Sequence, residues 1–142
     1  MKFVIMGISE LAIACTQALI DSGVEICAFI SMPKKSRPNN PVDFSSFAGE
    51  KNIPYYEIDD INCSEGIKII SKYKPDYIFG ALTKILKKDV LNIPKNYCIG
   101  SHPTDLPFNR GRHPLHWLIS MGIKESKLSG WKSAVKQTLT RN

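Results

Sequence analysis

The first thirty residues constrain the fold most, because they alternate strand, helix and strand signals. Residues 3–6 (Phe-Val-Ile-Met) form a continuous apolar run, as expected for a strand that is covered on both faces. Gly7 permits a tight turn, Ser9 is suited to cap a helix, and apolar residues then recur at helical spacing as far as Leu19. A second β-rich run covers residues 24–30. This order predicts a βαβ unit with parallel strands and a right-handed crossover.

The same alternation continues along the chain and predicts an α/β fold with a mostly parallel sheet. The further strands are expected at residues 53–58 (an edge strand), 76–80 and 97–100, and the further helices at residues 43–49, 64–75, 87–91 and from Pro114 onward. Residues 32–41 contain three prolines and three basic residues, which predicts a surface loop. Functional sites in such sheets lie beyond the carboxyl ends of the strands, so the loops after these strands are the places to search.

Composition and charge exclude several classes of protein. The 142 residues fit one domain, and they contain no apolar run of 18 residues, so a cytoplasmic protein without a membrane span is expected. The four cysteines are widely spaced, which predicts free thiols and no metal site. The net charge is +6, but Lys132, Lys136 and Arg141 near the end of the chain supply half of it. A nucleic-acid partner is therefore not expected from charge.

His102 is the strongest candidate for a catalytic residue. It directly follows an expected strand and precedes Pro103, which holds the backbone of His102 extended. An imidazole in this position can donate or accept a proton near neutral pH, and as an imidazolium it can stabilise an oxyanion. The other two histidines, His113 and His116, are interpreted as structural.

Two other loops contain candidate binding residues. Arg110 and Arg112 flank Gly111, and their guanidinium groups could bind a carboxylate or a phosphate; a solvated loop is the equally weighted alternative. The first loop, residues 7–10, has neither the glycine pattern of a dinucleotide-binding turn nor that of a P-loop. Its Glu10 would repel a phosphate, so an ordinary turn into a helix is expected there.

The order of these motifs resembles that of the folate-dependent formyltransferases. The resemblance rests on residues 102–107 (His-Pro-Thr-Asp-Leu-Pro), followed by Arg-Gly-Arg at 110–112. Upstream, residues 75–80 and 84–91 resemble the strand and the turn that precede the family's histidine strand, and residues 6–12 resemble its opening. The resemblance extends from residue 1 to about residue 129.

This resemblance implies a Rossmann-like fold with helices on both faces and the transfer of a formyl group from 10-formyltetrahydrofolate to an amine. His102 matches the catalytic histidine, which would polarise the formyl carbonyl and relay protons. The residues that match folate-contacting positions are Lys84, Ile85 and Leu86 in the pterin pocket, Thr104, Asp105, Leu106 and Pro107 beside the folate, and Arg112. The Arg-Gly-Arg form resembles the sugar branch of the family more than the transfer-RNA branch, so a nucleotide-linked amino sugar is the expected acceptor and small-molecule partner.

Two departures from the family favour an alternative, a truncated and catalytically deficient relative that serves as a remnant or a binding module. Gly100 stands where the family usually has an asparagine that donates a hydrogen bond to the formyl oxygen; losing one such donor commonly slows a reaction by a factor of about 10²–10³. The family then continues into strands and a catalytic aspartate, whereas residues 130–142 contain no acidic residue. Both alternatives stay open at this point, and formylation of methionyl-tRNA is a third alternative that ranks below the sugar.

The expected domain organisation is a partial formyltransferase domain at residues 1–129 and a divergent basic tail at residues 130–142. We expect the tail to be frayed or at most loosely helical, because it contains too few large apolar residues for a buried element. The sheet would then be incomplete at its C-terminal end, and the helix that begins at Pro114 would be partly uncovered. Self-association is expected from these exposed surfaces.

Overall fold

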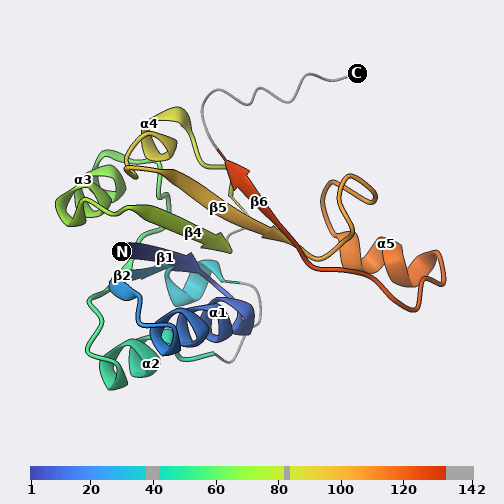
Figure 1. The fold of residues 1–142 in the computed structure, drawn as a ribbon, viewed down its shortest axis with the longest axis horizontal. Coiled ribbons are helices and arrows are strands. Elements are labelled where there is room, and N and C mark those ends of the chain that lie inside the picture. Colours follow the sequence, from blue (N-terminus) through green and yellow to red (C-terminus); the bar gives the residue numbers. More distant parts are fainter. Residues whose placement is uncertain (38–41, 82–83, 134–142) are drawn as a thin grey trace.

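The computed structural model describes residues 1–37, 42–81 and 84–133, and these residues form one six-stranded sheet with helices around it (Figure 1). The strand order is β3-β2-β1-β4-β5-β6. The strands are β1 (Lys2–Gly7), β2 (Glu25–Ser31), β3 (Tyr55–Glu57), β4 (Tyr77–Ala81), β5 (Tyr97–His102) and β6 (Ser129–Ser133). The first five are parallel and β6 is antiparallel to β5, which confirms the predicted α/β fold with a mostly parallel sheet.

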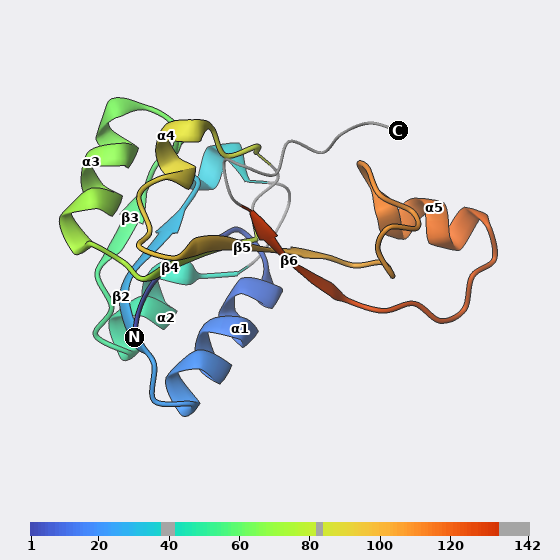
Figure 2. The same cartoon turned by 45° about the horizontal axis from the view of Figure 1, so that its top comes forward.

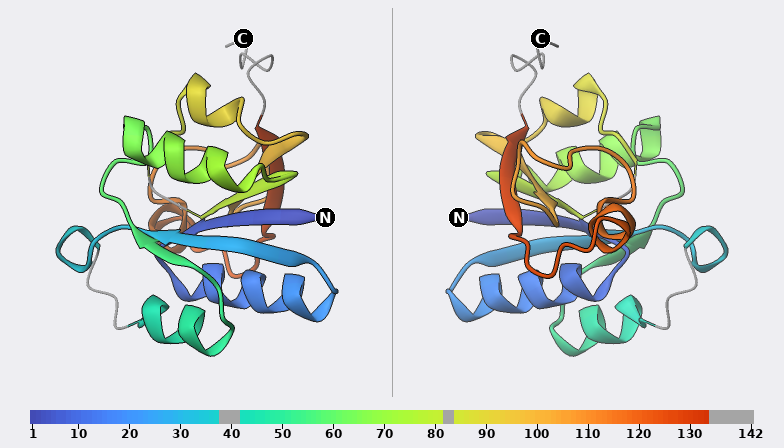
Figure 3. Two further views of the ribbon diagram at one scale, coloured as in Figure 1. Left: turned by 90° about the vertical axis from the view of Figure 1, so that its left-hand side faces the viewer. Right: turned by 90° about the vertical axis from the view of Figure 1, so that its right-hand side faces the viewer.

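The helices cover both faces of the sheet (Figures 2 and 3). They are α1 (Glu10–Asp21), η1 (Lys34–Ser36, a 3-10 turn), α2 (Phe44–Glu50), α3 (Ser64–Tyr73), α4 (Lys88–Leu91) and α5 (Pro114–Ser120). Successive residues of β1 alternate between the faces: Phe3 and Ile5 pack on the side of α1 and α2, whereas Val4 and Met6 pack on the side of α3 and α4. This two-sided burial explains why β1 reads as a continuous apolar run.

Gly7 ends β1 because the first turn of α1 passes very close to it. A Cβ atom built on Gly7 would collide with the Cβ of Ala12. Ser9 occupies the N-cap position of α1, as expected, but its side chain makes no capping hydrogen bond. The chain runs outward from β1 to β3 and then returns to β4 beside β1. The strand order therefore reverses between β1 and β4, which is where open α/β sheets bind ligands.

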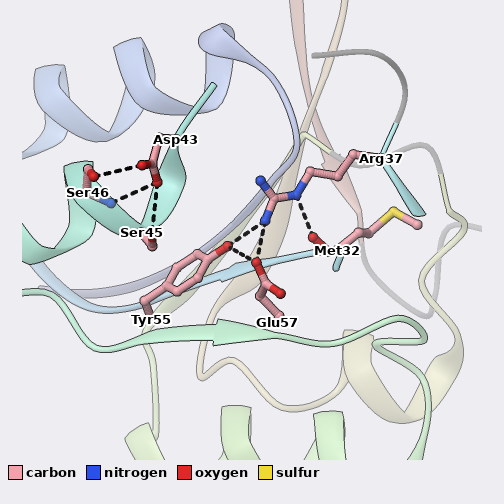
Figure 4. A network of polar contacts seen from close by, with 7 residues as sticks. All are labelled: Met32, Arg37, Asp43, Ser45, Ser46, Tyr55 and Glu57. Carbon is pink, nitrogen blue, oxygen red and sulfur yellow. Dashed lines mark hydrogen bonds and ion pairs between the residues drawn. The ribbon is translucent and has the colours of Figure 1, made fainter. Parts of the chain in front are cut away.

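The edge strand β3 is fastened by Arg37 (Figure 4). The Arg37 side chain is only 6% exposed, and its guanidinium lies 2.7 Å from a carboxylate oxygen of Glu57. The guanidinium also donates hydrogen bonds to the Tyr55 hydroxyl and to the carbonyl of Met32. It lies 4.8 Å from the centre of the Phe44 ring as well. One buried cation thus joins the segment after β2 to β3 and α2.

The four cysteines are free thiols, as predicted. Burial raises the pKa of the Cys98 thiol to about 11, so this thiol stays protonated at neutral pH. Among the residues described by the structure, no group of three or more His, Cys, Asp or Glu side chains could hold a metal ion. None of the described helices is long and apolar enough to span a membrane.

The expectation that residues 130–142 are frayed or loosely helical is wrong for residues 130–133, which belong to β6. This strand pairs with β5 from Cys98 opposite Ser133 to His102 opposite Ser129. The sequence signal was weak because β6 is an edge strand in which Trp131 is the only large apolar residue. Residues 134–142, the remainder of the expected tail, lie outside the described residues.

The segment between β5 and β6 carries α5 away from the body of the sheet (Figures 1 and 2). Leu118 is buried, but Leu115, Trp117 and Ile119 are 55%, 62% and 77% exposed. The expectation that this helix is partly uncovered is therefore confirmed. We call residues 103–128, which connect the two strands, the α5 arm.

Candidate functional site

His102 ends β5 at the carboxyl edge of the sheet, between β4 and β6. Its side chain lies on the same face of the sheet as the side chain of Cys98 and the bare position of Gly100, because alternate residues of a strand share a face. The imidazole is partly exposed, and its Nε2 lies 3.2 Å from the carbonyl oxygen of Asn109. A carbonyl oxygen only accepts hydrogen bonds, so the neutral ring that makes this bond carries its proton on Nε2. The lone pair of Nδ1 is then available to accept a proton.

The loop after His102 is fixed by two buried or half-buried hydroxyl groups. The Thr104 hydroxyl donates a hydrogen bond to the carbonyl of Phe108 at 3.0 Å. Ser129, on β6, donates to the carbonyl of Thr104 at 2.6 Å and accepts from the backbone N–H of Leu106 at 3.1 Å. The antiparallel strand therefore holds the loop that in turn orients the His102 ring.

The segment after β4 is anchored beside this edge by Asn62. The Asn62 side chain accepts a hydrogen bond from the backbone N–H of Lys87 at 2.7 Å and donates one to the carbonyl of Ile85 at 3.2 Å. Lys84 donates from its ammonium group to the carbonyl of Asp59. Leu86 packs against the core, and Ile85 is 88% exposed. The predicted folate segment is thus a fixed loop that presents one apolar side chain outward.

Between this loop and His102 the sheet carries two side-chain-free positions, Gly80 on β4 and Gly100 on β5, which are direct partners in the parallel register. A Cβ built on Gly80 would lie 3.9 Å from Cδ1 of Leu86. We call this pair the glycine floor. The structure therefore brings His102 and residues 84–86 to the carboxyl ends of adjacent strands, as expected.

The other predicted folate-contacting residues are more dispersed. Thr104 is fully buried, and its hydroxyl is used within its own loop. The Asp105 carboxylate forms an ion pair with Lys127 at 2.9 Å. Arg112 is exposed on the loop before α5 and makes no ion pair or hydrogen bond with another described residue. Of the remaining two, Leu106 is half-buried and Pro107 is exposed.

Sequence reasoning missed Trp131, which was assigned to the tail. Trp131 lies directly opposite Gly100 in the antiparallel register, and the two residues are in close contact. The available signal was the pairing of a glycine on one strand with a large aromatic residue on the next. That signal becomes visible only when β6 is known to pair with β5.

Comparison with known proteins gave curated relatives but no matching family model. The chain is 34% identical over 131 residues to a methionyl-tRNA formyltransferase of Desulforamulus reducens, a match that covers 89% of this chain and 41% of that protein. It is 37% identical over 135 residues to the enzyme of the same name from Mycoplasma genitalium, covering 90% of this chain and 42% of the relative. The chain thus spans about two fifths of the length of these relatives.

Solved structures share the fold. Glycinamide ribonucleotide transformylase 1 from Symbiobacterium toebii superposes with a TM-score of 0.70 at 14% identity, over 91% of this chain and 63% of that one. A formyltetrahydrofolate deformylase from Pseudomonas putida gives a TM-score of 0.67 at 20% identity, over 96% of this chain and 50% of that one. At these identities the likeness concerns the fold alone.

Proposed function

We propose that this chain, which belongs to the folate-dependent formyltransferase family and corresponds to its N-terminal domain, binds 10-formyltetrahydrofolate and presents the formyl group to an amine beside His102. One observation carries the proposal. His102, at the end of β5, shares the carboxyl edge of the sheet with the fixed loop at residues 84–87, which follows the adjacent strand β4.

The residues present suit the formyl donor. The glycine floor has no side chains of its own, but the Trp131 indole covers it at Gly100 and Leu86 lies over Gly80, so the ligand would lie against these two side chains at the edge of the sheet. Leu86 and the exposed Ile85 supply apolar surface, and the peptide groups of this loop supply hydrogen-bonding groups. When bound, 10-formyltetrahydrofolate would supply the carbonyl carbon that the amine attacks.

His102 would perform two proton-dependent tasks. With Nε2–H bonded to Asn109, Nδ1 takes a proton from the attacking amine. The resulting imidazolium would stabilise the negative charge that develops on the formyl oxygen. As the carbon–nitrogen bond to the donor breaks, the imidazolium would return the proton to the departing nitrogen, which releases tetrahydrofolate. Among the described residues no carboxylate is hydrogen-bonded to His102, and Gly100 supplies no side-chain donor where the family usually has an asparagine. We therefore expect folate binding with slow turnover, as in the alternative of a deficient relative.

Two acceptor amines are candidates. The names of the relatives at 34–37% identity favour methionyl-tRNA, and we propose it as the first acceptor. The likeness of Arg110-Gly111-Arg112 to the sugar branch supports a nucleotide-linked amino sugar, whose phosphates the two exposed guanidinium groups could bind. The preference for the sugar that was expected from the Arg-Gly-Arg pattern therefore becomes the second candidate.

A parallel transfer assay tests the proposal. The chain is incubated with 10-formyltetrahydrofolate labelled in the formyl group, together with either methionyl-tRNA or a uridine-diphosphate-linked amino sugar. We expect slow transfer of label to methionyl-tRNA, and transfer to the sugar would select the second candidate. Absence of transfer, together with absence of binding of 5-formyltetrahydrofolate in calorimetry, would refute the proposed function.

A further inference from the structure

Trp131 lies against the glycine floor. A Cβ built on Gly100 would be 2.5, 2.6 and 2.7 Å from Cε2, Cζ2 and Nε1 of the indole, distances that real Cβ atoms do not show. The indole therefore passes through the space that any larger residue at position 100 would need. Gly100 is buried although it has no side chain of its own. The absence of a side chain at Gly100 makes room for the Trp131 indole, and the indole in turn buries Gly100.

The part of the indole that lies against Gly100 includes its hydrogen-bond donor. The three atoms nearest Gly100 are consecutive along the edge of the ring that carries the N–H group. The indole nitrogen can only donate a hydrogen bond, and Nε1 has no acceptor among the described residues. The ring is 46% exposed, so one surface rests on Gly100 while the remainder is accessible. The N–H group thus belongs to the part of the ring that covers Gly100, and it makes no hydrogen bond to a described residue.

His102 lies close to this donor on the same face. Trp131 pairs with Gly100, and His102 is two residues further along β5, opposite Ser129. At about 3.3 Å per residue, the His102 position is roughly 7 Å from that of Gly100. A formyl carbonyl at this edge of the sheet, beside the indole and not above Gly100, could therefore meet both the imidazole and the indole N–H.

From this geometry we infer that Trp131 is a substrate-contacting residue of the proposed formyl-transfer site, and that its indole N–H donates a hydrogen bond to the formyl carbonyl presented to His102. The inference rests on the proposed function. The inference gives a binding role to a residue of the edge strand β6, opposite the position where Gly100 supplies no side chain.

Calorimetric titration with 5-formyltetrahydrofolate tests the inference. Trp131→Phe keeps the ring but removes the donor, and we expect its affinity to fall about 3- to 10-fold, the range for one hydrogen bond. Trp131→Ala removes both the ring and the donor, so its affinity should fall further. Gly100→Ala should displace the indole and weaken binding similarly, and combining it with Trp131→Ala should add little further loss. Trp117→Phe on α5 is the matched control and should bind within twofold of the wild type.

A second readout separates local contact from loss of structure. In a Trp117→Phe background, Trp131 is the only tryptophan, and ligand should change its fluorescence. Thermal unfolding shows whether each variant retains its fold. If the wild type binds while Trp131→Phe, Trp131→Ala and Gly100→Ala bind equally well and the fluorescence is unchanged, the inference is wrong and the proposed function stands. If the wild type does not bind at all, the proposed function fails first and the inference falls with it.

Discussion

At the scale of single residues, the account depends on His102. Its ring is oriented by one hydrogen bond to the Asn109 carbonyl and is partly exposed at the end of β5. Whatever formyl-transfer or formyl-hydrolysis activity the chain has should fall at least about 100-fold in His102→Ala, the lower range for losing a general acid or base. His113→Ala is the control, because His113 lies at the start of α5, within the α5 arm, where its ring packs against that of His116. Equal losses in the two variants, with folding intact, would show that the wrong histidine was selected.

Arg112 gives a second prediction at this scale. It is exposed and unpaired among the described residues, so its guanidinium is free to meet an anionic part of the ligand. Arg112→Ala should weaken folate binding by about 1–3 kcal/mol if a charged hydrogen bond is lost. Calorimetry of the two proteins measures this difference. An unchanged affinity would show that Arg112 does not contact the ligand and lies on a solvated loop.

The position of His102 at the end of a strand was predictable from the sequence, whereas the position of Trp131 was not, for a physical reason. The position of His102 is set locally, by an apolar strand before it and a proline after it. The position of Trp131 depends on pairing between strands that are separated by the whole α5 arm. Thr104 shows a further limit, because the sequence does not reveal that its hydroxyl is used by the carbonyl of Phe108.

At the scale of elements, β3 illustrates how a short edge strand is stabilised. The buried Arg37 guanidinium bonds to Tyr55, Glu57 and the Met32 carbonyl. Arg37→Met retains much of the apolar stem but removes these bonds, so the free energy of unfolding should fall by about 2–3 kcal/mol. Urea titration measures the change, with the exposed Lys35→Met as control. Equal stability of the two variants would contradict a role for Arg37 in holding β3.

The same network predicts how stability depends on pH. Burial, followed by the hydrogen bond to Glu57, raises the pKa of Tyr55 to about 12, above the value of about 10 in an unfolded chain. Between these values the folded protein holds a proton that the unfolded chain releases, so the free energy of unfolding should fall as the pH rises from about 10 to about 12. Urea titrations across this range measure the slope. Tyr55→Phe should make it shallower, and an unchanged slope would locate the effect elsewhere.

The strands were predicted correctly where their sequence pattern was strong. Five parallel strands were predictable because each lies in a stretch rich in apolar or aromatic residues between helical patterns, whereas β6 has Gly130, polar residues and one tryptophan. A strand of this composition forms because β5 offers it an unpaired edge. The boundary drawn at residue 129 therefore falls within a strand rather than between a domain and a tail.

At the scale of the whole molecule, the α5 arm and β6 expose most of the large apolar side chains that are accessible in the described residues. They are Phe108, Leu115, Trp117, Ile119, Met121, Ile123, Leu128 and Trp131. Exposed apolar surface of this extent favours association.

We predict that the chain self-associates at micromolar concentrations and that Leu115→Glu combined with Ile119→Glu reduces this association. Sedimentation velocity over a concentration series measures it. Ile85→Glu, which changes an equally exposed isoleucine outside the arm, is the control and should associate like the wild type. A wild-type chain that stays monomeric throughout the series would contradict the prediction.

The most direct test of the central claim is to map where a formylfolate binds, by following backbone amide resonances of the isotope-labelled chain during titration with 5-formyltetrahydrofolate. We predict shifts concentrated at three places on one edge of the sheet: residues 84–87, residues 100–104 and residues 129–131. Shifts confined to β3 and α2, or no shifts at saturating ligand, would contradict the assignment of the site to the His102 edge.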